Sequence, residues 1–153
     1  ETRDFGKMEI EEDKIIHFPS GIIAFEDMKR FFIIEGGQDD LPFCWLQSVE
    51  DGNLSFVLLN PFLFKPDYEL EIPDTVVKEL EIEKEEDVAV FSIVVVPEDI
   101  SKISANLLAP VIINIKRLKG KQIILNDKRY TVKHYILEEL KKIKGAGQDV
   151  GAK

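Results

Sequence analysis

The chain has 153 residues and a mass of 17.5 kDa, which leaves room for one ordinary domain. It is 44% hydrophobic and 32% charged, which excludes a mainly disordered chain, because disordered chains lack the apolar surface that offsets backbone ordering. The net charge of −9 argues against unspecific binding to nucleic acid or anionic lipid, since both require excess Lys and Arg.

Short β-strands dominate the local pattern, as runs of β-branched or aromatic residues bounded by turn formers. Residues 50–53 (Glu-Asp-Gly-Asn) separate two such runs and predict a hairpin turn, because Gly and Asn tolerate positive φ. Tight reversals are also expected at residues 119–120 and 126–127, which gives a meander near the C-terminal end. In chain order, the expected strands cover residues 14–18, 31–34, 43–49, 54–60, 88–96, 110–116 and 122–125.

Two helices are expected among these strands. Asp74 is placed to cap a short helix over residues 75–80, and a second helix is expected over about residues 134–144. Gly-Ala-Gly at residues 145–147 is expected to stop this helix and leave a disordered polar tail over residues 145–153. The apolar faces consist of Val76, Val77 and Leu80 in the first helix, and of Ile136, Leu137, Leu140 and Ile143 in the second.

The spacing of these elements predicts a single mainly-β domain over residues 1–144. About eight short strands at close spacing, without long helices between them, favour an antiparallel sheet that closes into a barrel or sandwich. No internal repeat and no Ser- or Pro-rich linker divides the chain. Its apolar stretches are far shorter than the roughly 20 residues of a membrane helix, and no retained signal peptide or membrane association is expected.

Catalytic chemistry finds little support in the sequence. A single cysteine excludes an internal disulfide framework and is easiest to reconcile with a reducing cytoplasm. Cys44 lies between two aromatic residues and has the pattern of a small buried hydrophobe, with no nucleophile motif around it. His17 is expected to pack in or beside a strand, and His134 to lie on the surface at the start of a helix. A hydrolase using Cys44 and a histidine is an alternative.

No cofactor or metal is expected. Gly36 and Gly37 lack the third glycine and the Lys-Ser/Thr of a phosphate-binding loop, so they predict a turn. Acidic residues cluster at 9–13 and 81–87, but neither cluster has the alternating pattern with a central glycine of a calcium loop. Solvated surface is the favoured interpretation of both clusters.

Charge is divided unevenly along the chain. Residues 1–87 hold 23 acidic and 8 basic residues, whereas residues 88–153 hold 6 acidic and 12 basic residues. Such asymmetry is a possible partner-binding signal. Cations at residues 116–121 and 128–129 resemble part of a nucleic-acid patch, but Tyr130 and Tyr135 are the only aromatic side chains nearby. A small β-barrel that binds RNA or oligosaccharide through this basic half is the alternative function.

Residues 60–68 form an apolar segment that contains two prolines and three large apolar side chains between them. Pro61 and Pro66 interrupt strand pairing, so the segment is expected to be a sheet edge or a connection. Alternation would place Phe62 and Phe64 on one side and Leu63 on the other. These side chains either cover an end of the barrel or form a partner-binding ridge, and residues 106–110 pose the same question.

At these segments the sequence closely resembles the FliW family of bacterial flagellar assembly factors. The resemblance covers roughly residues 5–140. Its two longest motifs are Phe43-Cys44-Trp45-Leu46-Gln47-Ser48-Val49-Glu50-Asp51 and Asn60-Pro61-Phe62-Leu63-Phe64-Lys65-Pro66-Asp67-Tyr68, and further matches lie at residues 6–10, 15–21, 25–27, 96–99, 106–110, 114 and 120–125. The family usually reads Gly-Ile-Pro-Gly-Phe-Glu where this chain has Gly21-Ile22-Ile23-Ala24-Phe25-Glu26, a departure that bears on the shape of this turn.

The resemblance implies a partial β-barrel without enzymatic activity or cofactor. It implies two protein partners, flagellin and the RNA-binding translational regulator CsrA. A family member freed from flagellin binds CsrA and relieves repression of flagellin translation, and accumulating flagellin captures it again. The chain is then expected to be cytoplasmic, monomeric when free, and without direct contact to nucleic acid.

The residues themselves add a hypothesis about where partners bind. An acidic surface over residues 69–87 would attract an RNA-binding protein and repel RNA phosphates, while the apolar segments would contribute contact area. The hypothetical partner-binding residues are Phe62, Phe64, Asp67, Tyr68, Glu69, Glu71, Asp74, Asn106, Leu107 and Pro110.

Overall fold

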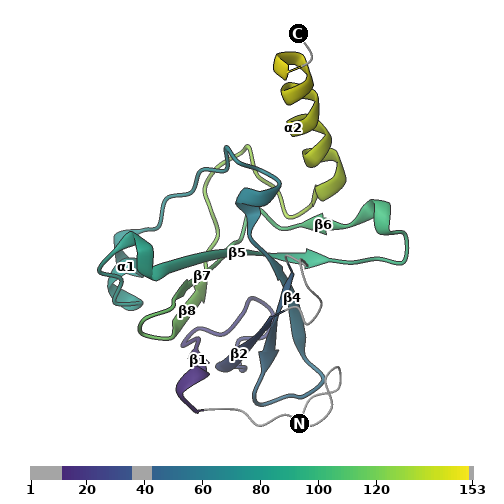
Figure 1. The fold of residues 1–153 in the computed structure, drawn as a ribbon. Coiled ribbons are helices and arrows are strands. Elements are labelled where there is room, and N and C mark those ends of the chain that lie inside the picture. The colour runs from purple at the N-terminus through teal and green to yellow at the C-terminus, as the bar shows by residue number, and fades with distance from the viewer. Residues whose placement is uncertain (1–11, 36–42, 152–153) are drawn as a thin grey trace.

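The expected β-barrel is confirmed by a computed structural model, which describes residues 12–35 and 43–151, with the side chains of residues 13–35 and 43–143 (Figure 1). Seven strands follow one another in the order β4-β3-β2-β1-β8-β7-β5, and pairing of β4 with β5 closes the ring. The strands are β1 (Ile16–His17), β2 (Arg30–Glu35), β3 (Cys44–Ser48), β4 (Ser55–Leu59), β5 (Val88–Val95), β6 (Ser104–Ala105), β7 (Val111–Asn114), β8 (Lys119–Gln122) and β9 (His134–Tyr135).

Closure of the barrel depends on β5, whose two halves pair with different strands. Its first half pairs with β7, from Val88 opposite Asn114 to Phe91 opposite Val111. Its second half pairs with β4 on the opposite edge and with the short β6 beside β7. All these pairings are antiparallel, whereas β1 and β8 meet in parallel at one register pair, a junction that the sequence pattern did not predict.

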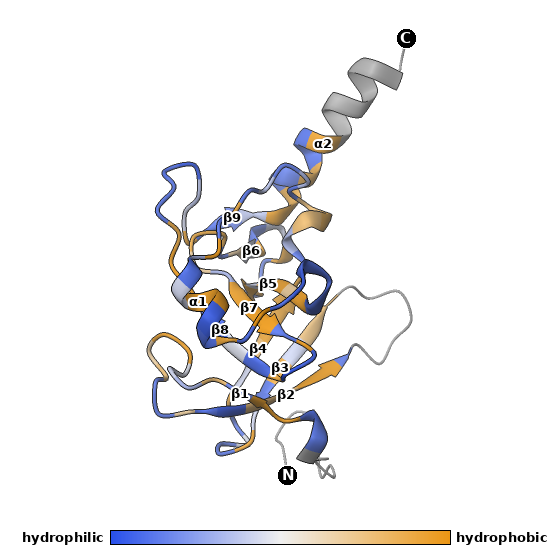
Figure 2. Cartoon of the chain, turned by 90° about the vertical axis from the view of Figure 1, so that its left-hand side faces the viewer, coloured by the Kyte–Doolittle hydropathy of each residue, from blue (hydrophilic) through white to orange (hydrophobic). Residues whose placement is uncertain are grey.

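Alternation along the strands creates two separate cores. In β7, Val111 and Ile113 point into the barrel, while Ile112 points outward and packs beneath the connecting segments. In β4, Leu58 and Leu59 divide in the same way. Figure 2 shows this concentration of hydrophobic residues in the strands, with hydrophilic residues in many of the surrounding loops. The outer core lets irregular segments such as residues 60–73 and 123–133 pack firmly without strand pairing.

The second half of the hairpin from β7 to β8 differs from the expectation. The reversal lies at residues 115–118, not 119–120, and β8 begins at Lys119. The buried Asn114 side chain explains this, because its Oδ1 accepts hydrogen bonds from the backbone of Lys116 and Arg117 and so starts the turn early. Residues 123–125 are not a strand, although the backbone of Ile123 and Leu125 still donates hydrogen bonds to the segment before β7.

The helices exist where expected but begin and end differently. Helix α1 (Asp74–Glu79) includes Asp74 as its first residue, and its N-cap Pro73 makes no side-chain hydrogen bond, so the expected Asp74 cap was wrong. Helix α2 (Ile136–Gly151) starts after His134, which belongs to β9. It also continues through residues 145–147, because each helical glycine costs only about 1 kcal/mol and does not by itself end a helix. Disorder of residues 145–153 stays a prediction.

The remaining helices are single 3-10 turns: η1 (Glu12–Lys14), η2 (Pro61–Leu63), η3 (Glu85–Asp87) and η4 (Ile100–Lys102).

The expected hairpin over residues 50–53 is confirmed between β3 and β4. The buried Gln47 side chain fills it and donates hydrogen bonds to backbone carbonyls of Ser48 and Leu54, each at 3.1 Å. The expected turn at residues 36–37 and most of the acidic cluster at residues 9–13 lie outside the described residues.

Gly120 is a position where the barrel tolerates no side chain. A Cβ at this position would lie 2.5 Å from Cζ of Phe18, whose ring is fully buried inside the barrel. We expect Gly120→Ala to lower the free energy of unfolding by about 1–3 kcal/mol or more, as overpacking does, measured by urea denaturation. The control is Ile115→Ala at an exposed turn position, which should change stability by less than about 0.5 kcal/mol. Equal effects would contradict this packing.

Candidate partner-binding surfaces

The apolar segment after β4 forms a helical turn and not an extended ridge. Asn60 caps η2 by accepting a hydrogen bond from the backbone N–H of Phe62 at 2.9 Å. This turn leaves Phe62 and Leu63 exposed, at 39% and 54%, and buries Phe64 in the outer core. The expected grouping of Phe62 with Phe64 was therefore wrong, because a 3-10 turn has three residues per turn instead of a strand's alternation. The exposed ridge consists of Phe62 and Leu63.

Residues 106–110 form a bulge between β6 and β7. They lie opposite only two residues of β5, Ser92 and Ile93, since β6 and β7 pair with the residues on either side. The Asn106 side chain shapes the bulge, because its Oδ1 accepts hydrogen bonds from the backbone of Leu108 and Ala109. Leu107 and Pro110 are buried within it. Within the bulge, a partner could reach only the half-buried side chains of Asn106 and Leu108.

An open apolar groove of about 360 Å³ runs along this bulge. Three of its lining residues are exposed aliphatic side chains, namely Ile124 at 67%, Val132 at 61% and Ile23 at 44%. Not one lining residue is charged. The groove is lined by Ile22, Ile23, Phe56, Ile93, Asn106, Leu108, Ala109, Gln122, Ile124 and Val132. Large apolar side chains exposed together are typical of a binding surface.

A strained turn forms one side of the groove. The backbone N–H of Phe25 donates to the carbonyl of Ile22 at 2.7 Å, and Ala24 between them has a φ of 76°. A positive φ at the third turn residue is that of a type II turn, which favours Gly there and Pro before it. The chain therefore keeps the turn that Pro-Gly would form, despite its Ile23-Ala24. Gln122 supports the turn by accepting a hydrogen bond from the backbone of Ile23.

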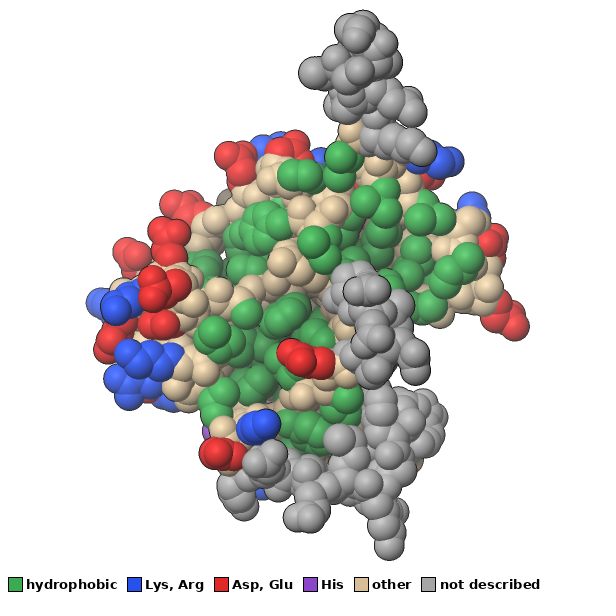
Figure 3. Space-filling view, viewed as in Figure 1, with side chains coloured by type: hydrophobic (Ala, Val, Ile, Leu, Met, Phe, Trp, Pro, Cys, Tyr) green, Lys and Arg blue, Asp and Glu red, His purple; other side chains and the backbone are tan. Residues whose placement is uncertain are grey.

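The acidic and basic parts of the sequence meet in space. Figure 3 shows acidic and basic side chains intermixed on the left of the molecule, where Figure 1 places α1. Four acidic residues of the segment 69–83 pair with basic residues of the C-terminal part, so these cations do not form a free patch for nucleic acid. The pairs are Glu69 with Arg129, Glu79 with Lys121, Glu81 with Lys119 and Arg117, and Glu83 with Arg117.

Four further acidic residues, between positions 71 and 86, are not among these pairs. Glu71, Asp74, Glu85 and Glu86 are exposed, and within the described part of the chain none of their side chains makes an ion pair or hydrogen bond. We call these four the free acids. Across the same described part, no three Asp, Glu, His or Cys side chains gather as metal ligands would, and no helix is long and apolar enough to cross a membrane.

Cys44 has the environment of a packing residue. It packs against the core inside the barrel, and burial, with a smaller contribution from Glu35, raises the pKa of its thiol to about 11. A thiol with such a pKa is a poor nucleophile at neutral pH. Both ring nitrogens of His134 are already engaged, by the backbone of Thr131 and by Glu139. The geometry therefore does not support a hydrolase built on these residues.

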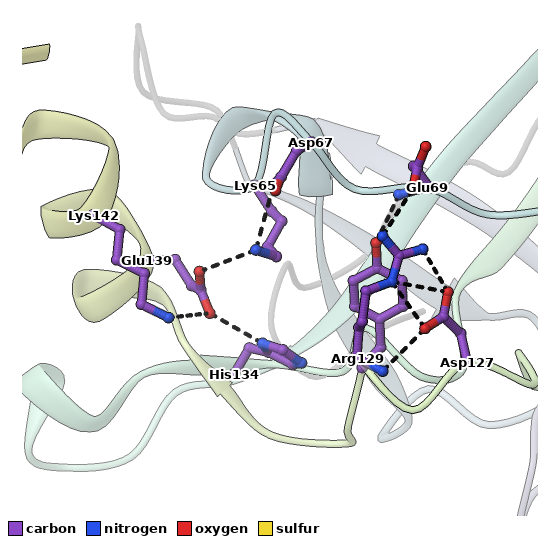
Figure 4. Close-up of polar contacts among 9 residues, drawn as sticks. Lys65, Asp67, Glu69, Asp127, Arg129, His134, Glu139 and Lys142 are labelled. Atoms are coloured by element: carbon purple, nitrogen blue, oxygen red, sulfur yellow. Dashed lines mark hydrogen bonds and ion pairs between the residues drawn. The ribbon is translucent and has the colours of Figure 1, made fainter. Parts of the chain in front are cut away.

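A polar cluster lies where α2 meets the barrel (Figure 4). Glu139 of α2 is 3.1 Å from His134 and 3.7 Å from both Lys65 and Lys142. Burial alone would raise the pKa of Glu139, but the hydrogen bond to His134 and the two lysines outweigh it, and the pKa lies below its ordinary value. The sequence did not predict this buried cluster, because nothing in the local pattern distinguishes Glu139 from the exposed Glu138.

A second polar cluster in Figure 4 joins the segment after η2 to the loop before β9. Arg129 binds Asp127 and Glu69, at 2.7 and 2.8 Å, and holds the pKa of Asp127 at about 2. In the same segment, the Tyr68 hydroxyl donates a hydrogen bond to the carbonyl of Leu107 at 2.6 Å. Tyr68 thus ties the segment after η2 to the bulge, a structural contact that the sequence did not predict.

The hypothetical partner-binding residues therefore divide by exposure. The structure buries the side chains of Phe64, Tyr68, Leu107 and Pro110, which leaves them a supporting role beneath the surface. It exposes Phe62, Asp67, Glu69, Glu71 and Asp74, and leaves Asn106 half-buried in the groove. Partner binding by the accessible residues stays a prediction.

Comparisons with known proteins agree on one family. The family model described as "FliW protein" matches residues 1–136. A flagellar assembly factor FliW of Alkaliphilus metalliredigens is 51% identical over 143 residues, which cover 94% of this chain and 88% of that protein. One from Caldicellulosiruptor saccharolyticus is 52% identical, covering 91% and 90%. A crystal structure of the flagellar assembly factor FliW matches with a TM-score of 0.82 and 38% identity, covering 88% and 94%.

The strain at Ala24 is open to a direct test. We expect Ala24→Gly to raise the free energy of unfolding by about 0.5–1 kcal/mol, because glycine adopts positive φ without steric cost and this outweighs its greater freedom in the unfolded chain. Ala89→Gly within β5 is the control and should lower stability by about 0.5–1 kcal/mol. Thermal or urea unfolding measures both, and a loss of stability in both variants would refute the strained turn.

Proposed function

The chain belongs to the FliW family, and on this premise we propose that it acts in flagellar assembly by binding flagellin and by antagonising the translational regulator CsrA. The apolar groove beside the bulge carries the proposal, because it offers an uncharged docking surface on a chain without catalytic geometry in its described part. The action is binding and not catalysis, and it takes place in the cytoplasm, where both partners are made.

Flagellin suits the groove by its chemistry. A subunit that later polymerises must carry apolar surface for its neighbours, and that surface needs cover until assembly. The groove presents exposed aliphatic side chains together with the Asn106 amide. A partner that buries Ile124 and Val132 gains the hydrophobic free energy of two side chains that are more than half exposed in the free protein.

CsrA suits the free acids. An RNA-binding protein presents cations to phosphates, so exposed carboxylates without ion pairs attract it and accelerate its association. Glu71, Asp74, Glu85 and Glu86 meet this requirement. The same charges repel RNA, and Arg117, Lys119 and Lys121 form ion pairs with Glu83, Glu81 and Glu79, respectively. These ion pairs weigh against the alternative of an RNA- or oligosaccharide-binding barrel that uses the basic half.

Aspartate substitutions in the groove test the flagellin surface. We expect Ile124→Asp and Val132→Asp to weaken binding of purified flagellin by about tenfold or more, because a buried unpaired charge is costly at an interface. Both side chains are exposed in the free protein, so folding is preserved. Ile115→Asp, at an aliphatic position outside the groove that is also more than half exposed, should leave the Kd from calorimetry unchanged.

The ridge supplies the competing outcome for this experiment. If Phe62→Ala and Leu63→Ala weaken flagellin binding while the two groove variants bind as tightly as the unmodified chain, flagellin docks on the ridge. The assignment of flagellin to the groove is then wrong, although the proposed function itself survives.

Charge reversal tests the CsrA surface. Each of Glu71→Lys, Asp74→Lys, Glu85→Lys and Glu86→Lys should slow association with CsrA by about threefold at low salt and flatten its dependence on salt concentration. Glu98→Lys makes the same charge change at an exposed acid near the end of β5 and is the control. Stopped-flow association between 50 and 500 mM NaCl, about the range over which screening grows strong, is the measurement. Equal slowing by Glu98→Lys would indicate only net charge.

A further inference from the structure

Glu139 is the one charged side chain that is buried among the described residues, with 8% of its side chain exposed. It belongs to the first turns of α2, a helix whose apolar residues Leu137 and Leu140 are 39% and 41% exposed. Figure 1 shows α2 projecting from the barrel. A helix with such an exposed apolar face makes few contacts with the barrel. Glu139 provides a polar contact among them.

His134 receives this contact in a defined tautomer. Its Nε2 lies 3.0 Å from the backbone nitrogen of Thr131, and a backbone N–H only donates, so Nε2 must carry a lone pair. The proton of the neutral ring is then on Nδ1 and is donated to Glu139 at 3.1 Å. The side chain of His134 is 12% exposed. Its ring can accept the hydrogen bond from Thr131 only in one orientation, and the hydrogen bond to Glu139 fixes that orientation.

Thr131 continues the connection to the groove. Its carbonyl accepts hydrogen bonds from the backbone of both Leu107 and Leu108, each at 3.1 Å. Leu108 lines the groove, as does Val132, which follows Thr131 in the chain. The Thr131 hydroxyl bonds the backbone of Lys133 and keeps this turn compact. An unbroken series of hydrogen bonds thus leads from α2 through His134 and Thr131 to the bulge.

We infer that His134 is a positioning residue that couples helix α2 to the groove. When α2 packs against the barrel, Glu139 orients the His134 ring through their hydrogen bond. His134 in turn fixes Thr131, and Thr131 keeps the bulge in the shape that forms the groove. A partner that draws Glu139 away from His134 loosens the groove, and a ligand seated in the groove favours docked α2, because coupling between two sites is reciprocal. The identity of that ligand rests on the proposed function, but the coupling itself is a property of the free chain.

Hydrogen exchange of the free chain tests the coupling. Glu139→Ala should accelerate exchange of the Leu107 and Leu108 amides by about tenfold, as expected for loss of one charge-assisted hydrogen bond in the series. Amides of β3, such as Leu46, should exchange as before. Glu138→Ala removes the exposed neighbouring carboxylate of the same helix and should leave both amides unchanged. Glu139→Gln keeps an acceptor for His134 and should restore most of the protection.

Two results would overturn the inference. One is unchanged exchange at Leu107 and Leu108 in Glu139→Ala, or equal acceleration in Glu138→Ala. The other requires no variant: nitrogen chemical shifts of His134 in the unmodified chain should show the tautomer protonated on Nδ1, and protonation on Nε2 alone would refute the connection even if Glu139→Ala fails to fold.

Flagellin binding separates this inference from the proposed function. Glu139→Ala should raise the Kd for purified flagellin by about threefold to tenfold relative to Glu138→Ala, within the usual range of couplings between sites. If the unmodified chain does not bind flagellin at all, the proposed function fails while hydrogen exchange still decides the coupling. If the unmodified chain binds and both variants bind equally well, the coupling does not reach the ligand and the inference is wrong.

Discussion

The divided pairing of β5 is the constraint from which the rest of the structure follows. One edge of β5 pairs with β4 along its second half and closes the barrel. The other edge pairs with β7 along the first half and with β6 along the second half. Five residues, 106–110, lie opposite Ser92 and Ile93 between these two pairings, so the chain must bulge there. A bulge leaves backbone groups without ladder partners. Asn106, Thr131 and Tyr68 satisfy them here, and the segments that bring these residues also build the groove.

Sequence reasoning succeeded where hydrophobic alternation determines structure. The strands β2, β3, β4, β5 and β7 carry β-branched or aromatic runs, and burial on one or both faces keeps them in place, so their positions were predictable. The strand β8 consists of Lys119-Gly120-Lys121-Gln122 and has no such run, and it was expected three residues later, over residues 122–125. The two-residue strands β6 and β9 have no pattern of their own and exist only because β5 pairs with β6 and β6 with β9. Likewise, a 3-10 turn at Phe62 and a buried Glu139 depend on contacts with distant segments, which no local period reveals.

The distribution of charge along the sequence likewise did not predict how the charges are arranged in the folded chain. The uneven division between the two parts of the sequence suggested an acidic surface and a basic patch. In the folded chain, Glu79, Glu81 and Glu83 form ion pairs with three cations, Lys121, Lys119 and Arg117, so part of the apparent asymmetry cancels locally. The buried Asn114 makes this possible, because its amide donates hydrogen bonds to the carbonyls of Leu80 and Glu81 and brings the end of α1 beside the turn before β8. The charge left over at the free acids is smaller, and it is exposed.

We propose that one chain exchanges two protein partners, and a titration with both partners tests this proposal most directly. The chain is first saturated with CsrA, flagellin is then added, and the complexes are separated by size. We expect that each partner binds alone, that added flagellin releases CsrA, and that the released CsrA again binds its RNA. Failure of the chain to bind either purified partner, or direct binding of RNA by the chain itself, would contradict it.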